Sequence, residues 1–119
     1  MSMPYTWMRT LSAGSIPAVL RLYAPYAVLV ATYNTEPLMG HQQLKEYFKM
    51  FMGNKGLHGQ IDSMITQKVG AATVYSGLYT FRFKEKGKPK TVKARYTYVV
   101  APTPQGPRIV THHSSEVPE

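Results

Sequence analysis

The feature that most constrains the fold is a change in hydrophobic period about halfway along the chain. In the first half, apolar residues recur at helical spacing on one face, at Leu44, Tyr47, Phe48 and Phe51. From about residue 60 onward, apolar and polar residues alternate instead, as they do in strands with one buried face. This order predicts an α+β fold, in which helices pack on one face of a strongly curved antiparallel sheet.

Capping and turn residues predict where the helices and strands begin and end. Ser15 is suited to be an N-cap, with Pro17 in the first turn of the helix that it begins. Gly77 lies in the middle of an expected strand, where it favours a sharp bend of the sheet. We expect helices over residues 5–12, 15–24 and 41–52, and strands over residues 27–33, 60–68, 72–84, 90–101 and 107–115.

Length and composition exclude several classes of protein. The chain has 119 residues, which is one domain's worth, and its 44% hydrophobic content argues against disorder. It has no cysteine, which excludes disulfides, thiol catalysis and zinc–thiolate sites. It also has no glycine-rich phosphate loop and no serine nucleophile elbow, so we expect neither a cofactor nor a metal. We find no transmembrane stretch and no secretory signal, and expect a cytoplasmic protein.

The chain is basic, with a formal net charge of +8. Five lysines fall within residues 84–93, where Gly87 and Pro89 indicate a turn, so this cluster is expected at a hairpin tip. Two interpretations stay open. The lysines either are solvated side chains of an edge strand that discourage aggregation between sheets, or they bind a polyanion such as nucleic acid. We expect no nucleic acid partner and no membrane partner.

Four segments resemble the SnoaL-like and nuclear transport factor 2-like superfamily: TLSAGSIPAVLRLYAPYAV, EPLMG, ARYTYV and the terminal IVTHHSSEVP. The resemblance is closest to the SgcJ/EcaC group, a neighbour of the kinase II association domain, although Pro107 stands where that group usually has tryptophan. The resemblance implies that residues 1–119 form a single SnoaL-like domain with a shortened first helix and a cone-shaped, cystatin-like fold. It also implies a deep pocket and a homodimer formed through the outer face of the sheet.

Two basic side chains are the candidates for chemistry. In the similar family, the arginine of the ARYTYV strand points into the pocket, so Arg95 is expected to bind an anionic or carbonyl group. His113 shares one strand face with Ile109 and Thr111, and we expect this face to be the concave one. His113 is therefore a candidate general acid–base. The alternatives are that Arg95 has only a structural role and that His113 is a packing histidine. We expect ligand contacts from Trp7, Tyr33, Tyr79, Thr97 and Thr111.

The segments around two other positions resemble those of the ketosteroid isomerases of the same superfamily. The position of their catalytic aspartate is held here by Ala31, and that of their oxyanion-hole tyrosine by Trp7. Alanine offers no base, and an indole offers a single N–H donor. We therefore expect no steroid isomerase activity of the usual kind.

The leading hypothesis is a small-molecule pocket protein of the SnoaL-like type, whose ligand is apolar with one anionic or carbonyl end. An enzymatic form would be a cofactor-free isomerase, cyclase or hydrolase-like protein, in which His113 transfers a proton and Arg95 stabilises negative charge. Two alternatives remain. One is a non-catalytic association or ligand-binding domain, which the scarcity of carboxylates favours, and the other is a nucleic-acid-binding module that uses the lysine-rich hairpin.

Overall fold

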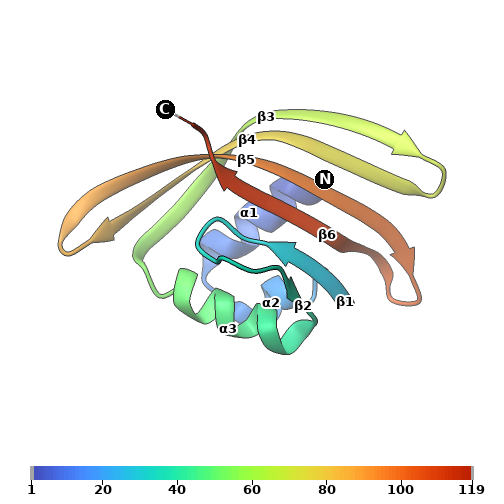
Figure 1. Ribbon diagram of the computed structural model, residues 1–119, viewed down its shortest axis with the longest axis horizontal. Coiled ribbons are helices and arrows are strands. Elements are labelled where there is room, and N and C mark those ends of the chain that lie inside the picture. The colour runs from blue at the N-terminus through green and yellow to red at the C-terminus, as the bar shows by residue number, and fades with distance from the viewer. Residues whose placement is uncertain (1, 119) are drawn as a thin grey trace.

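The computed structural model describes residues 2–118 and contains three helices beside one six-stranded sheet (Figure 1). The elements in chain order are α1 (Met3–Ala13), α2 (Ile16–Leu20), β1 (Tyr23–Val30), β2 (Leu38–Met39), α3 (His41–Phe51), β3 (Lys55–Val69), β4 (Ala72–Glu85), β5 (Lys88–Thr103) and β6 (Gly106–Glu116). None of the helices in the described part of the chain is long and apolar enough to cross a membrane.

The sheet is strongly bent, and the helices lie together on its concave side (Figure 1). Its strand order is β2-β1-β6-β5-β4-β3, so the long strands β3 to β6 form the expected antiparallel meander. The pairing of β1 with β6 is parallel and brings the two halves of the chain together. The predicted α+β architecture is therefore confirmed, and the expected antiparallel sheet contains one parallel pair.

The second helix is shorter than predicted. Ser15 caps it as expected, because its hydroxyl accepts a hydrogen bond from the amide of Ala18 at 3.2 Å. The helix ends at Leu20 rather than at residue 24, and Tyr23 begins β1. The carbonyl of Leu22 accepts the amide of Ile109 in β6 at 2.8 Å, so pairing between strands takes the place of helical hydrogen bonds here.

A bulge in β6 changes which of its residues face the helices. Val99 pairs with Thr111 and Val100 pairs with Ile109, so Val110 is an extra residue without a partner in β5. An extra residue reverses the alternation, and Ile109 therefore shares the buried face with His112. The prediction that Ile109, Thr111 and His113 line the concave face together is wrong for this reason.

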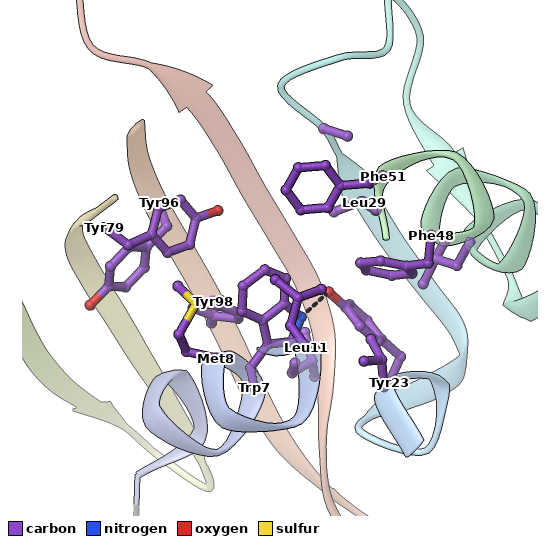
Figure 2. Packing of buried hydrophobic residues seen from close by; sticks show 14 of the residues in the cluster. Trp7, Met8, Leu11, Tyr23, Leu29, Phe48, Phe51, Tyr79, Tyr96 and Tyr98 are labelled. Atoms are coloured by element: carbon purple, nitrogen blue, oxygen red, sulfur yellow. Dashed lines mark hydrogen bonds between the residues drawn. The ribbon is translucent and has the colours of Figure 1, made fainter. Parts of the chain in front are cut away.

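The core is centred on Trp7 of α1, which reaches the sheet between aromatic side chains (Figure 2). Its indole stacks on Tyr79 with ring centroids 5.8 Å apart and meets Tyr98 and Phe48 edge-on. Aromatic pairs of this kind each add about 0.5–1.5 kcal/mol beyond the burial of their area. Packing around one indole thus joins α1, α3 and the inner face of the sheet.

Gly77 of β4 lies close to the backbone of β3 at Ser63. A Cβ atom at this position would lie 2.0 Å from the carbonyl oxygen of Ser63, which already accepts the hydroxyl of Tyr96 at 2.8 Å. Because backbone atoms cannot give way as a side chain tip can, we expect Gly77→Ala to lower the free energy of unfolding by roughly 3 kcal/mol, or to prevent folding. Urea denaturation of the purified variant measures this loss.

Gly70→Ala is the matched control. Gly70 lies in the turn between β3 and β4 with a φ of 59°, and the space around it is open. Alanine there should cost only about 1 kcal/mol, because it adopts a left-handed conformation without a clash. Equal losses in the two variants would contradict the close approach at Gly77.

Candidate functional site

A line of buried hydrogen bonds crosses the concave face and joins six side chains. It begins at α1, where the indole Nε1 of Trp7 donates to Tyr23 Oη at 2.9 Å (Figure 2). Tyr23 Oη lies 2.8 Å from His112 Nδ1, so the line passes from β1 to β6. It then continues through Tyr79 and Ser114 and reaches Thr32 at the end of β1.

The second half of the line is formed by hydroxyl groups. Tyr79 Oη lies 3.2 Å from His112 Nε2 and donates to Ser114 Oγ at 2.5 Å. Ser114 Oγ lies 2.8 Å from the hydroxyl of Thr32. We call these six residues the inner chain: Trp7, Tyr23, His112, Tyr79, Ser114 and Thr32. Each member finds a partner, as buried polar groups must.

The direction of the inner chain follows from the proton of Tyr79. Tyr79 donates its single proton to Ser114, so it accepts from His112 Nε2. A neutral His112 with its proton on Nε2 then accepts at Nδ1 from Tyr23, which itself accepts from Trp7. Burial, and to a lesser extent the charge of the neighbouring His113, lowers the pKa of His112 to about 3. Burial also raises the pKa of Tyr23 and that of Tyr79.

A small cavity lies beside the inner chain, between the sheet and α3. Its polar end is formed by Thr32, His112 and Ser114, and its aromatic end by Tyr33, Tyr47 and Phe51, together with other apolar side chains. The space open to the centres of water molecules is about 20 Å³, enough for one water. The pocket that we expected to be deep is therefore nearly closed in this conformation.

Three of the five residues expected to contact a ligand lie around this cavity. Trp7 and Tyr79 form its wall, and Tyr33, which is 37% exposed, stands where the cavity reaches the surface. Ala31 also lines the cavity and supplies no base there. The N–H of Trp7 is occupied by Tyr23, so it is not free to stabilise an oxyanion.

The predicted placement of Arg95, His113, Thr97 and Thr111 is wrong, because all four lie on the outer face of the sheet. In β5 the buried residues are Tyr96 and Tyr98, so Arg95 and Thr97 between them point away from the helices. In β6 the bulge at Val110 has the same result for Thr111 and His113. These side chains therefore cannot act on a ligand in the cavity.

The residues on the outer face still lie close together. Arg95 pairs with Ser115 and Thr97 pairs with His113, and these four side chains line an open hollow of about 220 Å³. Within residues 2–118, no group of three or more histidine and carboxylate side chains is arranged to hold a metal ion. The hollow offers donors from its side chains and is open to solvent.

Sequence reasoning missed His112, Tyr23 and Ser114 as members of the site. The alternation in β5 contained a usable indication, because Tyr96 and Tyr98 are the apolar set of that strand and mark its buried face. Cross-strand pairing then places Ser114 opposite Tyr96 and His112 opposite Tyr98. The apolar residues of β5, rather than its arginine, identify the inner face.

A family model and a related solved structure each match nearly the whole chain. Residues 1–118 match the family model of the calcium/calmodulin dependent protein kinase II association domain. A Xanthomonas campestris protein assigned to this domain type has 34% identity and a TM-score of 0.89, covering 98% of this chain and 84% of that one. None of the proteins with curated functions matches the sequence.

More distant structures share the fold alone. The S. rosetta CaMKII hub has 17% identity and a TM-score of 0.83, with 96% of this chain and 91% of that chain covered. A nuclear transport factor 2-like superfamily protein from Salmonella enterica has 18% identity and a TM-score of 0.86, with 98% and 87% covered. The expected nuclear transport factor 2-like, cystatin-like fold is thus confirmed.

The buried neutral state of His112 predicts a dependence of stability on pH. An imidazole in the unfolded chain takes up a proton near pH 6.5, whereas buried His112 does so only near pH 3. Between these values unfolding takes up a proton, so the free energy of unfolding should fall by about 1.4 kcal/mol for each pH unit of acidification. Urea denaturation between pH 7.5 and 4.5 measures this slope.

Two variants isolate the contribution of His112 from that of other titrating groups. His112→Gln removes the imidazole, so the variant should lose this part of the slope and its stability relative to the wild type should improve as the pH falls. His113→Gln changes the exposed neighbour on the opposite face, which is the smaller cause of the lowered pKa of His112, so this variant should keep most of the wild-type slope. If wild type and His112→Gln show parallel profiles, His112 is not held neutral.

Proposed function

The chain belongs to the calcium/calmodulin-dependent protein kinase II association domain family, and on that premise we propose that it is a non-catalytic association module that forms homo-oligomers through the outer face of its sheet. The family membership rests on the match over residues 1–118. The S. rosetta relative of the same fold is described as a hub, which supports an assembly role. Placement in the SgcJ/EcaC group is a further proposal, which rests on the terminal IVTHHSSEVP segment.

Exposed apolar side chains on the outer face carry this proposal. Ile65, Val69 and Leu78 are 66%, 61% and 44% exposed, and the pairing of β3 with β4 places them on the face opposite the helices. Val74 and Val99 lie partly buried between them and β6. A contiguous apolar surface of this kind is uncommon on monomers and is typical of a contact with another protein.

The charge distribution limits where two copies can meet. Arg82, Lys93 and Arg95 lie on the same outer face, toward the lysine-rich hairpin between β4 and β5. Because each copy carries a formal net charge of +8, a contact centred on these side chains would bring like charges together. We therefore centre the proposed contact on Ile65, at the apolar part of the face that includes Val74 and Val99. Leu78 lies at the border of this contact, because it pairs with Arg95.

The chemistry of the cavity supports association rather than catalysis. Its described lining contains no carboxylate and no amine, and its only imidazole is His112, whose pKa burial lowers to about 3. Proton transfer at an activated carbon needs a base whose pKa is near the working pH. The isomerase, cyclase and hydrolase-like hypotheses therefore find no suitable base in the cavity at neutral pH.

Binding of a small molecule is a second candidate function, which one specific observation favours. The cavity combines a polar end at Thr32 and Ser114 with an aromatic end at Tyr33, and few precisely placed polar groups among apolar walls are typical of ligand sites. Anion binding by Arg95 and His113 is a separate proposal for the outer hollow, because neither side chain lines the cavity.

A single charge on the outer face tests the assembly proposal. Ile65→Glu places a carboxylate in the centre of the proposed contact, where its desolvation is costly. Light scattering should give wild-type protein a mass of at least twice 13.4 kDa, and should give the variant a mass near 13.4 kDa. Met50→Glu is the matched control, because Met50 of α3 is 50% exposed and lies away from this face, so its mass should equal that of the wild type.

A wild-type mass near 13.4 kDa at micromolar concentration would rule out the proposed assembly. An oligomer that both variants leave intact would instead place the contact on another surface. An oligomer that Met50→Glu dissociates and Ile65→Glu does not would assign the contact to the helical side.

A further inference from the structure

We propose that the polar end of the cavity binds the oxygen of a small neutral carbonyl compound, through a hydroxyl proton that the inner chain leaves unused at Ser114 and Thr32. This inference rests on the proposed ligand-binding role of the cavity and names the class of ligand. It is independent of the assembly proposal, which concerns the opposite face of the sheet.

Counting protons along the inner chain identifies the unused donor. Its six members carry one polar proton each, because His112 is neutral, and they form five hydrogen bonds with one another. Tyr79 donates to Ser114 and therefore accepts from His112, so the protons of Tyr23, His112 and Tyr79 are all committed toward Ser114. One proton joins Ser114 to Thr32, and one hydroxyl proton of this pair has no acceptor among the described residues.

The position of this proton makes it available to a ligand. Both Ser114 and Thr32 line the cavity, and Ser114 is buried. The unused proton belongs to buried Ser114 or to half-buried Thr32, and a hydroxyl donor without a protein acceptor is costly to bury, so an acceptor in the cavity is favourable. The space of about 20 Å³ holds one atom the size of an oxygen.

The surroundings favour a neutral acceptor over an anion. The described lining consists of aromatic, aliphatic and hydroxyl side chains with His112, which burial keeps neutral, and Arg95 points away on the outer face. A carboxylate in such a site would lose its hydration without gaining a counter-charge. A ketone, aldehyde or amide oxygen accepts the same hydrogen bond without that cost.

The other end of the cavity indicates the body of the ligand. Tyr47 and Phe51 stack with ring centroids 5.9 Å apart, and Tyr33 lies 6.0 Å from Phe51 at the partly exposed mouth. A flat aromatic ring matches these three rings, since aromatic pairs pack at such distances. An aryl ketone with its oxygen at Ser114 would place its ring among these side chains, which must move apart to admit it because the cavity holds a single water in this conformation.

Three compounds of similar shape separate the possible outcomes. Acetophenone has a neutral carbonyl, α-methylstyrene replaces the oxygen by carbon, and benzoate carries a charge. Binding is followed through the indole N–H resonance of Trp7, which is the only tryptophan of the chain and begins the inner chain. We expect acetophenone to bind at least fivefold more tightly than α-methylstyrene, and benzoate to leave the resonance unchanged at neutral pH.

A double variant locates the hydrogen bond. Thr32→Val/Ser114→Ala removes both hydroxyls of the polar end at nearly constant shape, so the preference for acetophenone over α-methylstyrene should disappear. Thr97→Val/Ser115→Ala makes the same two changes on the outer face and should keep the wild-type preference. Circular dichroism of both variants establishes that each is folded.

Each other outcome overturns the inference in a distinguishable way. Tightest binding of benzoate, or equal affinity for acetophenone and α-methylstyrene, would refute the neutral acceptor and leave a ligand role for the cavity. A preference for acetophenone that survives Thr32→Val/Ser114→Ala would place its hydrogen bond elsewhere. If no compound shifts the Trp7 resonance at millimolar concentration, both the carbonyl site and the ligand-binding role fail.

Discussion

The need to pair buried polar groups at the centre of the core determines much of this structure. The indole of Trp7, the hydroxyl of Tyr23 and the ring of His112 are all less than 3% exposed, and each would be costly without a partner. They satisfy one another across α1, β1 and β6. The parallel pairing of β1 with β6 brings Tyr23 to His112, so the two halves of the chain are joined by hydrogen bonds as well as by apolar packing.

The bulge at Val110 is what turns His112 toward this centre. Without the extra residue, the face of β6 that carries Ile109 would continue to Thr111 and His113, and His112 would point to solvent. With it, the sheet has a neutral inner face, whose polar groups are paired, and an outer face that holds Arg95, His113 and the exposed apolar residues. The proposed ligand site and the proposed contact between copies therefore lie on opposite sides of one sheet and can be tested separately.

The sequence predicted the architecture better than the site, for a physical reason. Hydrophobic period and turn residues are local signals, so the helices and the four long strands were expected close to where they lie. The short strand β2 was not predicted, and the second helix was predicted too long. The bulge depends on how β5 and β6 pair over a distance, and no single residue near Val110 indicates it. An error of one residue there exchanged His112 for His113. Trp7 lies on the inner face of a regular helix and Tyr79 on the inner face of a strand that keeps its alternation there, and both line the cavity.

The protonation state of His112 is the most direct test of this account, because the direction of the inner chain depends on it. Nitrogen-15 NMR of the histidine side chains, recorded from pH 7.5 to 4.5, distinguishes a ring with its proton on Nε2 from one with its proton on Nδ1 and from the charged form. We expect His112 to remain neutral over this range with its proton on Nε2, as its hydrogen bond to Tyr79 requires. A proton on Nδ1, or uptake of a second proton above pH 5, would contradict the account.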